Sequence, residues 1–423
     1  MTTVFLGQKN RLAQAIAVLA VTIVGTRIFI ASGLTVGIAV SLLLLPLWLP
    51  ALRRYQWAVP LMLLGLVTIL SGAWLTDLHS ATHRTSVGSV IDSGLLIIGL
   101  LSAVGVILWA RELLPLWVIG SMFGTGMLIT AVQTGALGGS NAWKFGIGFP
   151  VMVIILALLS RPGMRAIDTA ALLILAVISV ITDSRYRFAS LTIAAVLILW
   201  QMLPKTSSRR TSALTTIAVF GTIALITYNL VTAVLVEGYL GEQAQARSID
   251  QIDRSGSLIV GGRPELAASI SLFADNPLGF GSGTFPTQAD ILVAKTGMAS
   301  VGYDPNNGYV ENYMFGTGFE LHSVAGDMWA LFGFPGLAFA IATLVIVIRS
   351  LGQTLADRAA TGLLVFLCIS MLWNTLFSPI YGSLSTIVLT LGLALMPKPP
   401  VEPFGSPRSI RTRSARLRAR TPA

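Results

Sequence analysis

Apolar runs of roughly 20 residues, separated by short polar segments, recur along the whole chain. Because an α-helix rises about 1.5 Å per residue and the hydrocarbon core of a bilayer is about 30 Å thick, each run has the length of a transmembrane helix. Residues 12–50 carry one charge, Arg27, and as a single helix they would be about 58 Å long. We therefore expect two spans there, which turn between Arg27 and Gly33. Ten further runs are predicted at about 57–74, 89–110, 115–136, 146–160, 167–182, 188–203, 213–236, 323–348, 360–377 and 380–396.

This pattern predicts an all-α fold, a polytopic membrane helix bundle of about twelve transmembrane helices with one long extracytoplasmic loop that carries short helices. Residues 1–236 would hold the first nine helices, 237–322 the loop, 323–396 the last three helices, and 397–423 a basic tail. The composition agrees, because 54% of the residues are apolar and only 11% are charged, against about 25% charged in soluble domains. A soluble enzyme is thereby excluded. The single cysteine, Cys368, excludes a disulfide framework.

Lysine and arginine lie mainly in alternate segments, and this indicates the orientation, because cytoplasmic loops are enriched in these residues. With a cytoplasmic N-terminus, twelve basic residues lie in inner segments and five in short outer loops. The inner ones are Lys9, Arg11, Arg53, Arg54, Arg111, Arg161, Arg165, Lys205, Arg209, Arg210, Arg349 and Arg358. The outer ones are Arg27, Arg84, Lys144, Arg185 and Arg187.

The tail adds Lys398 and six arginines between Arg408 and Arg420 on the inner side. It has no apolar periodicity, so we expect it to be disordered and to be attracted to anionic membrane lipids. The net charge of +10 could otherwise indicate nucleic acid as a partner. Its distribution over inner loops and tail argues against nucleic acid.

The polar segment 237–322 is predicted on the outer side, between the ninth and tenth helices. It contains ten of the chain's 18 carboxylates, and a connector of this length in a compact bundle is usually functional. Pro264 and apolar residues at helical spacing predict a short helix over 264–274. The next residues, 275–285, read DNPLGFGSGTF, and their glycines would suit close approach of the backbone to a ligand or an ordinary connector. Aromatic residues between 302 and 319 suit a carbohydrate ligand or a membrane interface equally.

Several of these features occur in a fixed order. Two glycines precede Arg263, and then come the short helix, DNPLGFGSGTF, a variable insert, His322 followed by serine, and LFGFPG at 331–336. A Ser-Arg pair also lies within DSRYR at 183–187, at the outer end of the seventh predicted helix. This order, over about 75 residues, resembles that of the O-antigen ligase and polymerase superfamily, membrane glycosyltransferases that act on polyprenyl-pyrophosphate-linked glycans. The chain departs from that family at 265–268, where an aromatic residue is expected, and in having serine rather than the frequent asparagine after His322.

The resemblance implies a protein of the bacterial inner membrane, with both termini cytoplasmic, that acts in cell-surface polysaccharide biosynthesis. Its donor would be a glycan on undecaprenyl pyrophosphate. A hydroxyl of a glycan, lipid or protein acceptor would displace the lipid pyrophosphate at the anomeric carbon. Ligases and polymerases share this donor and differ in the acceptor, so both activities stay open here.

Pyrophosphate leaves without protonation if cations neutralise its developing charge, so such an enzyme needs guanidinium groups more than a general acid. Arg185, Arg187 and Arg254 are the candidates for binding the substrate pyrophosphate, because arginine binds phosphate bidentately and keeps its charge. Arg263 and His322 are the candidate catalytic residues, the histidine as the base or orienting acceptor for the incoming hydroxyl.

Glu320 and Asp327 are candidate auxiliary residues, the first beside His322 and the second as a carboxylate inside a predicted span. Each candidate also has a structural interpretation. Outer arginines can extend to lipid headgroups, Arg254 can pair with Asp250 or Asp253, and Asp327 can pair with a neighbouring helix.

Metal and cofactors are not expected. The chain has no Asp-x-Asp motif, the metal-binding device usual in nucleotide-sugar transferases, so a metal-independent reaction is predicted. His79 and His83 are spaced to share one helical face, but we expect them in a solvated outer loop rather than at a metal.

Two other classes of protein remain open. The alternative is a twelve-helix flippase for lipid-linked oligosaccharides or a secondary transporter, although transporters place ionisable groups near the midplane and these spans have few besides Asp92 and Asp327. A membrane scaffold protein would need no set of arginines and histidine. The sequence favours the glycosyltransferase.

Overall fold

The computed structural model describes residues 2–161, 163–203 and 241–399, with scattered positions between 204 and 240; at 2–10, 243, 244, 259 and 260 it describes the backbone alone. The ninth predicted run, 213–236, therefore lies largely outside the described residues. The tail, 397–423, does so almost entirely.

The described chain is helical apart from one small hairpin. The α-helices are α1 Thr2–Gly25, α2 Val36–Leu43, α3 Leu45–Ala51, α4 Ala58–Leu78, α5 Val87–Ala110, α6 Leu116–Gln133, α7 Gly148–Leu159, α8 Arg165–Ile181, α9 Arg185–Met202, α11 Glu242–Ser255, α12 Leu258–Gly262, α13 Glu265–Asp275, α14 Gln288–Ala299, α15 Val324–Ala356, α16 Gly362–Phe377 and α17 Ile380–Ala394. Short 3-10 helices are η1 Leu52–Arg54 and η2 Ala136–Gly138, and π-helices are η3 Trp143–Ile147 and η4 Val310–Met314. Strands β1 Phe29–Ala31 and β2 Leu34–Thr35 are antiparallel.

Four described helices, α4, α5, α6 and α15, are long and apolar enough to cross a bilayer. The bent pair Val36–Leu43 and Leu45–Arg54 would be a fifth if it forms one span. Shorter apolar helices are Arg11–Gly25, Trp143–Leu159, Gly362–Phe377 and Ile380–Ala394. The helical class is thus confirmed, and the number of twelve spans stays a prediction.

The helices pack closely because small residues lie where they cross. A Cβ atom on Gly126 of α6 would lie 2.0 Å from the carbonyl oxygen of Thr22 in α1, and one on Gly25 would lie 2.4 Å from that of Phe123. Only glycine permits such an approach of two helix backbones. Helix α5 contacts α1, α2, α3, α4 and α17 and carries the longest run of buried residues, so it forms the centre of the core.

The two spans expected at 12–50 turn in the predicted place, but the second is not a straight helix. After α1 the chain makes the β1–β2 hairpin, and α2 is followed by α3 at an angle of 72°. Pro46 in the first turn of α3 explains the bend, because proline has no N–H to continue the hydrogen bonding of α2.

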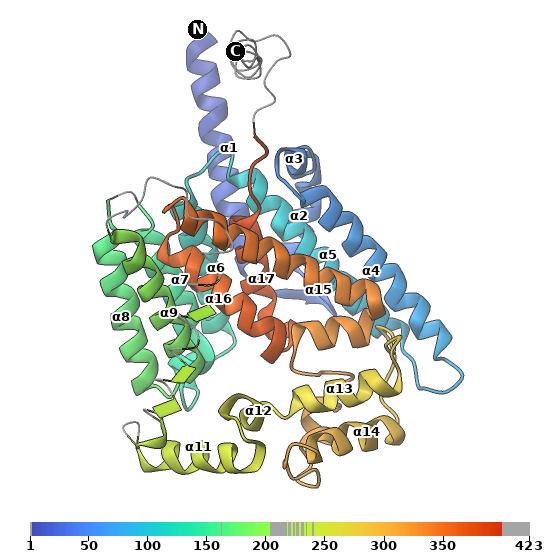
Figure 1. Ribbon diagram of the computed structural model, residues 1–423. Helices are drawn as coiled ribbons and strands as arrows, with labels where there is room; N and C mark the ends of the chain where they lie inside the picture. Colours follow the sequence, from blue (N-terminus) through green and yellow to red (C-terminus); the bar gives the residue numbers. More distant parts are fainter. Residues whose placement is uncertain are drawn as a thin grey trace, which may run out of the picture.

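Helices α11 to α14 gather at the end of the molecule opposite the start of α1 (Figure 1). Among them, α13 confirms the helix predicted over 264–274 and begins directly after Pro264. It packs along α14, and the two helices with η4 surround a small separate core that includes Phe280, Met298 and Phe319.

The glycine-rich residues of DNPLGFGSGTF contact helices. The N–H groups of Phe280 and Gly281 donate to the carbonyl of Ala330 in α15, at 2.8 and 3.0 Å, and the next N–H donates to Gly72 in α4. A Cβ atom on Gly281, whose φ is +108°, would lie 2.4 Å from the backbone nitrogen of Thr76. The close approach expected of these glycines is therefore to the bundle and not to a ligand.

Helix α15 corresponds to the predicted run 323–348 but extends to Ala356 and is broken. Gly333 has φ 64° and ψ −150° inside it, and Pro335 follows two residues later. The break lies within one turn of Ala330, so the glycine-rich residues are held at the point where α15 changes direction.

Candidate functional site

A cavity of about 1080 Å³ lies where α6, α7, α9, α16 and α17 meet α11, α12 and η4. This volume is at or above the upper end of the range for small-ligand pockets, roughly 300–1,000 Å³. Its walls combine aromatic rings, hydroxyl groups and charged side chains. The cavity can therefore hold a large amphipathic ligand.

The charge of the cavity is strongly unbalanced. Its lining includes six basic side chains, those of Arg27, Lys144, Arg185, Arg187, Arg247 and Arg263. Among the described residues, the lining includes a single carboxylate, that of Asp183. A concave surface lined by one sign of charge concentrates ions of the opposite sign. The ligand that this lining favours is an anion.

Arg185 and Arg187 stand at the start of α9, in the wall of the cavity. The N-terminus of a helix carries a partial positive charge, which adds to that of the two side chains. Arg185 Nη1 donates to Ser248 Oγ at 3.2 Å. Arg187 Nη1 donates to the carbonyl of Trp143 at 3.0 Å, while its buried Nε has no partner among the described residues.

Asp183 lies between two of these cations. Its carboxylate is 2.8 Å from Lys144 Nζ and 3.5 Å from Arg185 Nε, and its side chain is half exposed. Burial raises the pKa of Asp183, but the hydrogen bond and charge of Lys144, with the charges of Arg185 and Arg247, outweigh it and lower the pKa below its ordinary value.

Arg263 follows α12 and also lines the cavity, beside an aromatic group. Its guanidinium carbon lies 5.8 Å from the centre of the Trp373 ring. Trp373 in turn stacks on Tyr186 at 5.7 Å and packs against Phe377 at 4.7 Å. No acidic partner of Arg263 occurs in the described part of the chain, so its charge is available to a ligand.

His322 lies at the cavity just before α15, and its side chain is oriented by two contacts. The residue is 7% exposed and has φ 54°, a left-handed backbone that is uncommon outside glycine. Nδ1 lies 3.2 Å from the carbonyl of Glu320, and since a carbonyl only accepts, Nδ1 carries the proton. In the neutral imidazole, Nε2 is then the acceptor. The ring of Tyr313 stacks on the imidazole at 4.7 Å and 22°.

A partly buried hydrogen-bonded pair lies near this histidine. Tyr309 donates its hydroxyl to Glu265 Oε1 at 2.5 Å, and its ring lies 4.9 Å from that of Tyr313. Burial, followed by the negative charge of Glu265, raises the pKa of Tyr309, so the phenol stays protonated. The pair supports the ring that stacks on His322.

The other three predicted residues lie elsewhere. Arg254 pairs with Asp250 at 2.7 Å and is outside the cavity lining, which agrees with its structural interpretation. Glu320 is also outside the lining and accepts from Thr317 at 3.1 Å.

Asp327 is fully buried and lies outside the cavity lining, but its hydrogen bonds hold a segment that lines the cavity. One carboxylate oxygen accepts from the N–H of Leu321 at 2.6 Å, and the other accepts from the N–H of Ile380 at 2.8 Å. The residue therefore ties the turn that carries His322 to the start of α17.

Sequence reasoning did not select Arg27, Lys144, Asp183 or Arg247 as site residues, yet all four line the cavity. For Arg27 and Lys144, the distribution of basic residues in the sequence already carried a signal. Of the five basic residues predicted in short outer loops, all except Arg84 line the cavity. The position of a basic residue in a predicted short outer loop was thus an informative signal in addition to the motifs.

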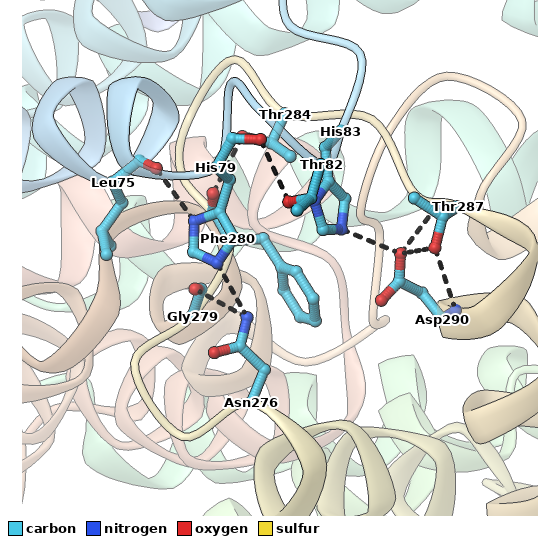
Figure 2. A network of polar contacts seen from close by, with 10 residues as sticks. All are labelled: Leu75, His79, Thr82, His83, Asn276, Gly279, Phe280, Thr284, Thr287 and Asp290. Atoms are coloured by element: carbon cyan, nitrogen blue, oxygen red, sulfur yellow. Dashed lines mark hydrogen bonds and ion pairs between the residues drawn. The ribbon is translucent and has the colours of Figure 1, made fainter.

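His79 and His83 lie in the mostly exposed turn after α4, as expected, but their own side chains are partly buried. Figure 2 shows them beside Phe280, in a network that joins the end of α4 to the residues around α14. His83 Nε2 lies 3.2 Å from Asp290, with side chains 11% and 7% exposed. His79 Nδ1 donates to Leu75, and its Nε2 accepts from Asn276 at 3.2 Å. The glycine-rich residues pack against α4 and α15, and this packing brings Asn276 and Asp290 to the two histidines.

Comparison of the chain with protein-family models, with curated proteins and with solved structures gives no match. Among the described residues, no three His, Cys, Asp or Glu side chains converge so that they could hold a metal ion. The reaction's independence of metal stays a prediction.

Proposed function

We propose that the protein is a membrane glycosyltransferase of the O-antigen ligase or polymerase type. It transfers a glycan from a polyprenyl pyrophosphate, such as undecaprenyl pyrophosphate, to a hydroxyl acceptor. The observation that supports the proposal is the cationic cavity, in which Arg185, Arg187, Arg263 and His322 lie together although 137 residues separate the first from the last.

In the proposed reaction, Nε2 of His322 takes the proton of the acceptor hydroxyl. The acceptor oxygen forms a bond to the anomeric carbon, and the bond from that carbon to the pyrophosphate oxygen breaks. The tautomer of His322 is suited to this role, because Nδ1 is held by a carbonyl and Nε2 is free to accept. Stacking on Tyr313 restricts rotation of the imidazole.

The arginines act on the leaving group. As the glycosidic bond breaks, the pyrophosphate gains one negative charge, and guanidinium groups that are already in place stabilise this charge without reorganisation. Arg187 and Arg263 are the strongest candidates, since neither has an acidic partner in the described chain. Trp373 beside Arg263 offers an aromatic face to a sugar ring.

We also propose that the bundle crosses a bacterial inner membrane about twelve times, with both termini cytoplasmic and the cavity on the outer side. Large apolar side chains exposed on the helices support a lipid surface, among them Leu70, Trp74 and Ile181 at 70%, 60% and 78% exposure. The excess of basic residues in the predicted inner segments supports the orientation.

The test is incubation of the purified, reconstituted protein with a polyprenyl-pyrophosphate oligosaccharide and an acceptor glycan, with and without a chelator. We expect release of polyprenyl pyrophosphate and an extended acceptor, at a rate that the chelator does not reduce. Movement of intact lipid-linked oligosaccharide across the bilayer, without release of pyrophosphate, would favour the flippase instead.

A further inference from the structure

We propose that Lys144, Arg185 and Arg247 form a subsite for one phosphate group of the ligand, and that Asp183 is the internal anion that competes with this phosphate. The inference rests on the proposed function, because it concerns the same cavity. It adds a specific role for the one acidic side chain in the lining.

The geometry of the cluster supports this assignment. Asp183 contacts two cations from different elements, Lys144 of η3 at 2.8 Å and Arg185 of α9 at 3.5 Å. Arg247 of α11 interacts electrostatically with the same carboxylate and lines the cavity. Two cations from two elements therefore contact one anion, and a third cation, Arg247, lines the same cavity.

The remaining contacts indicate that the cluster serves a ligand rather than stability alone. Asp183 is 51% exposed and Lys144 is 29% exposed, and ion pairs with this much solvent contribute little to folding. Both residues line the cavity, so a phosphate oxygen can reach the same cations. Arginine and lysine are the usual side-chain partners of phosphate.

A competing carboxylate has a chemical use in the proposed reaction. The substrate is a pyrophosphate diester, whereas the released polyprenyl pyrophosphate ends in a monoester and carries an additional negative charge. A purely cationic site would hold this product more tightly than the substrate. Asp183 weakens binding of both, and because it can reoccupy the cations it favours product release.

The first test is the affinity of the purified full-length protein for inorganic pyrophosphate, measured by isothermal titration calorimetry. Asp183→Asn keeps the shape of the side chain, and asparagine tolerates the backbone φ of 53° at this position. We expect D183N to bind pyrophosphate about tenfold more tightly, because a nearby opposing charge is removed. Lys144→Gln and Arg247→Gln should each weaken binding about five- to tenfold.

The matched control is Arg84→Gln, which removes an outer basic residue that packs over Phe285 outside the cavity. Its affinity should stay within about twofold of the wild type, since bulk charge alone has a small, screened effect. An unchanged or weaker affinity in D183N overturns the proposal, as does an R84Q effect equal to that of R247Q. Asp183→Gly, which adopts a positive φ freely, is a second variant with the same expected increase.

The second test separates this inference from the proposed function. In the transfer assay, D183N should lower both kcat and KM, with a burst of product in the first turnover, because product release slows. If pyrophosphate affinities follow the stated order but no glycan is transferred, the subsite is supported and the proposed function fails. If glycan is transferred and D183N has wild-type affinity and kinetics, the proposed function is supported and the subsite is wrong.

Discussion

Two polar regions near the helices α11 to α14 differ in how completely their charges are paired. In the network around Phe280, both histidines and Asp290 have hydrogen-bond partners from the protein (Figure 2). In the described lining of the cavity, six basic side chains are opposed by the carboxylate of Asp183 alone. Both regions contain histidine beside aromatic rings, so residue type does not distinguish them.

The difference favours the cavity as the ligand site. Buried polar groups are normally satisfied within a protein, and a satisfied network fixes local structure. An excess of one charge on a concave surface has no such structural use. We therefore expect changes in the network to alter stability, and changes in the cavity to alter binding and chemistry. Four substitutions or conditions test this division, in order of decreasing effect.

The largest effect should follow His322→Ala. Loss of the base should lower the rate of glycan transfer by about 10²- to 10⁴-fold, the usual contribution of a positioned acid or base. The measurement is release of polyprenyl pyrophosphate by reconstituted protein, with membrane insertion checked by protease accessibility. Normal activity of the purified variant would refute the site assignment.

Arg263→Ala should lower the transfer rate by roughly 10²- to 10³-fold, because one charged donor to the leaving group is lost. Arg263→Lys should recover only part of this, since lysine keeps the charge without the bidentate geometry. Single-turnover rates measure the effect, and Arg84→Gln is the control. Equal loss in R84Q would mean that overall charge, and not position, matters.

In the network, His83→Ala should reduce stability and spare the chemistry. It leaves Asp290 without one partner in a site that is 7% exposed, which costs roughly 1–3 kcal/mol in the free energy of unfolding. The melting temperature in detergent should fall by a few degrees, while transfer at low temperature should stay near the wild-type rate. A variant with a normal melting temperature and no activity would show that His83 belongs to the functional site.

The smallest effect concerns pH. The pKa of Asp183 is below its ordinary value of about 4, so the carboxylate is charged above that pH and loses its charge only in stronger acid. The ratio of pyrophosphate affinities of D183N and wild type should therefore change by less than about twofold between about pH 5 and 8. Calorimetry over this range provides the measurement, and the ratio cancels protonation of pyrophosphate itself. A ratio that approaches one at about pH 6 would contradict the lowered pKa.

Much of this arrangement could be predicted from local sequence. Helix α13 was predictable because Pro264 and the apolar spacing act within a few residues. Arg185, Arg187, Arg263 and His322 were selected from motif order and from the chemistry of pyrophosphate, and the fold brings them to one cavity. Lys144 belongs to no motif, but its position in a predicted outer loop, where basic residues are few, was already a sign of function.

What could not be predicted depends on contacts between distant segments. The glycines of DNPLGFGSGTF looked suited to a ligand, but their partners are carbonyl groups in α4 and α15 that only the packed bundle brings near. Arg254 was selected from the sequence and Arg247 was not, but α11 pairs Arg254 with Asp250 and places Arg247 in the cavity lining. The apolar periodicity likewise gave no sign of the break at Gly333.

The hydrogen bonds of Asp327 have a consequence for biosynthesis. Chains are made from the N-terminus, so α1 to α9 are complete before the turn that carries His322 is translated. One carboxylate oxygen of Asp327 lacks its hydrogen-bond donor until Ile380, the first residue of α17, has been translated. The turn that carries His322 thus gains its second anchor only after nearly the whole bundle has been translated, and a chain truncated before Ile380 has the cavity arginines without this hydrogen bond.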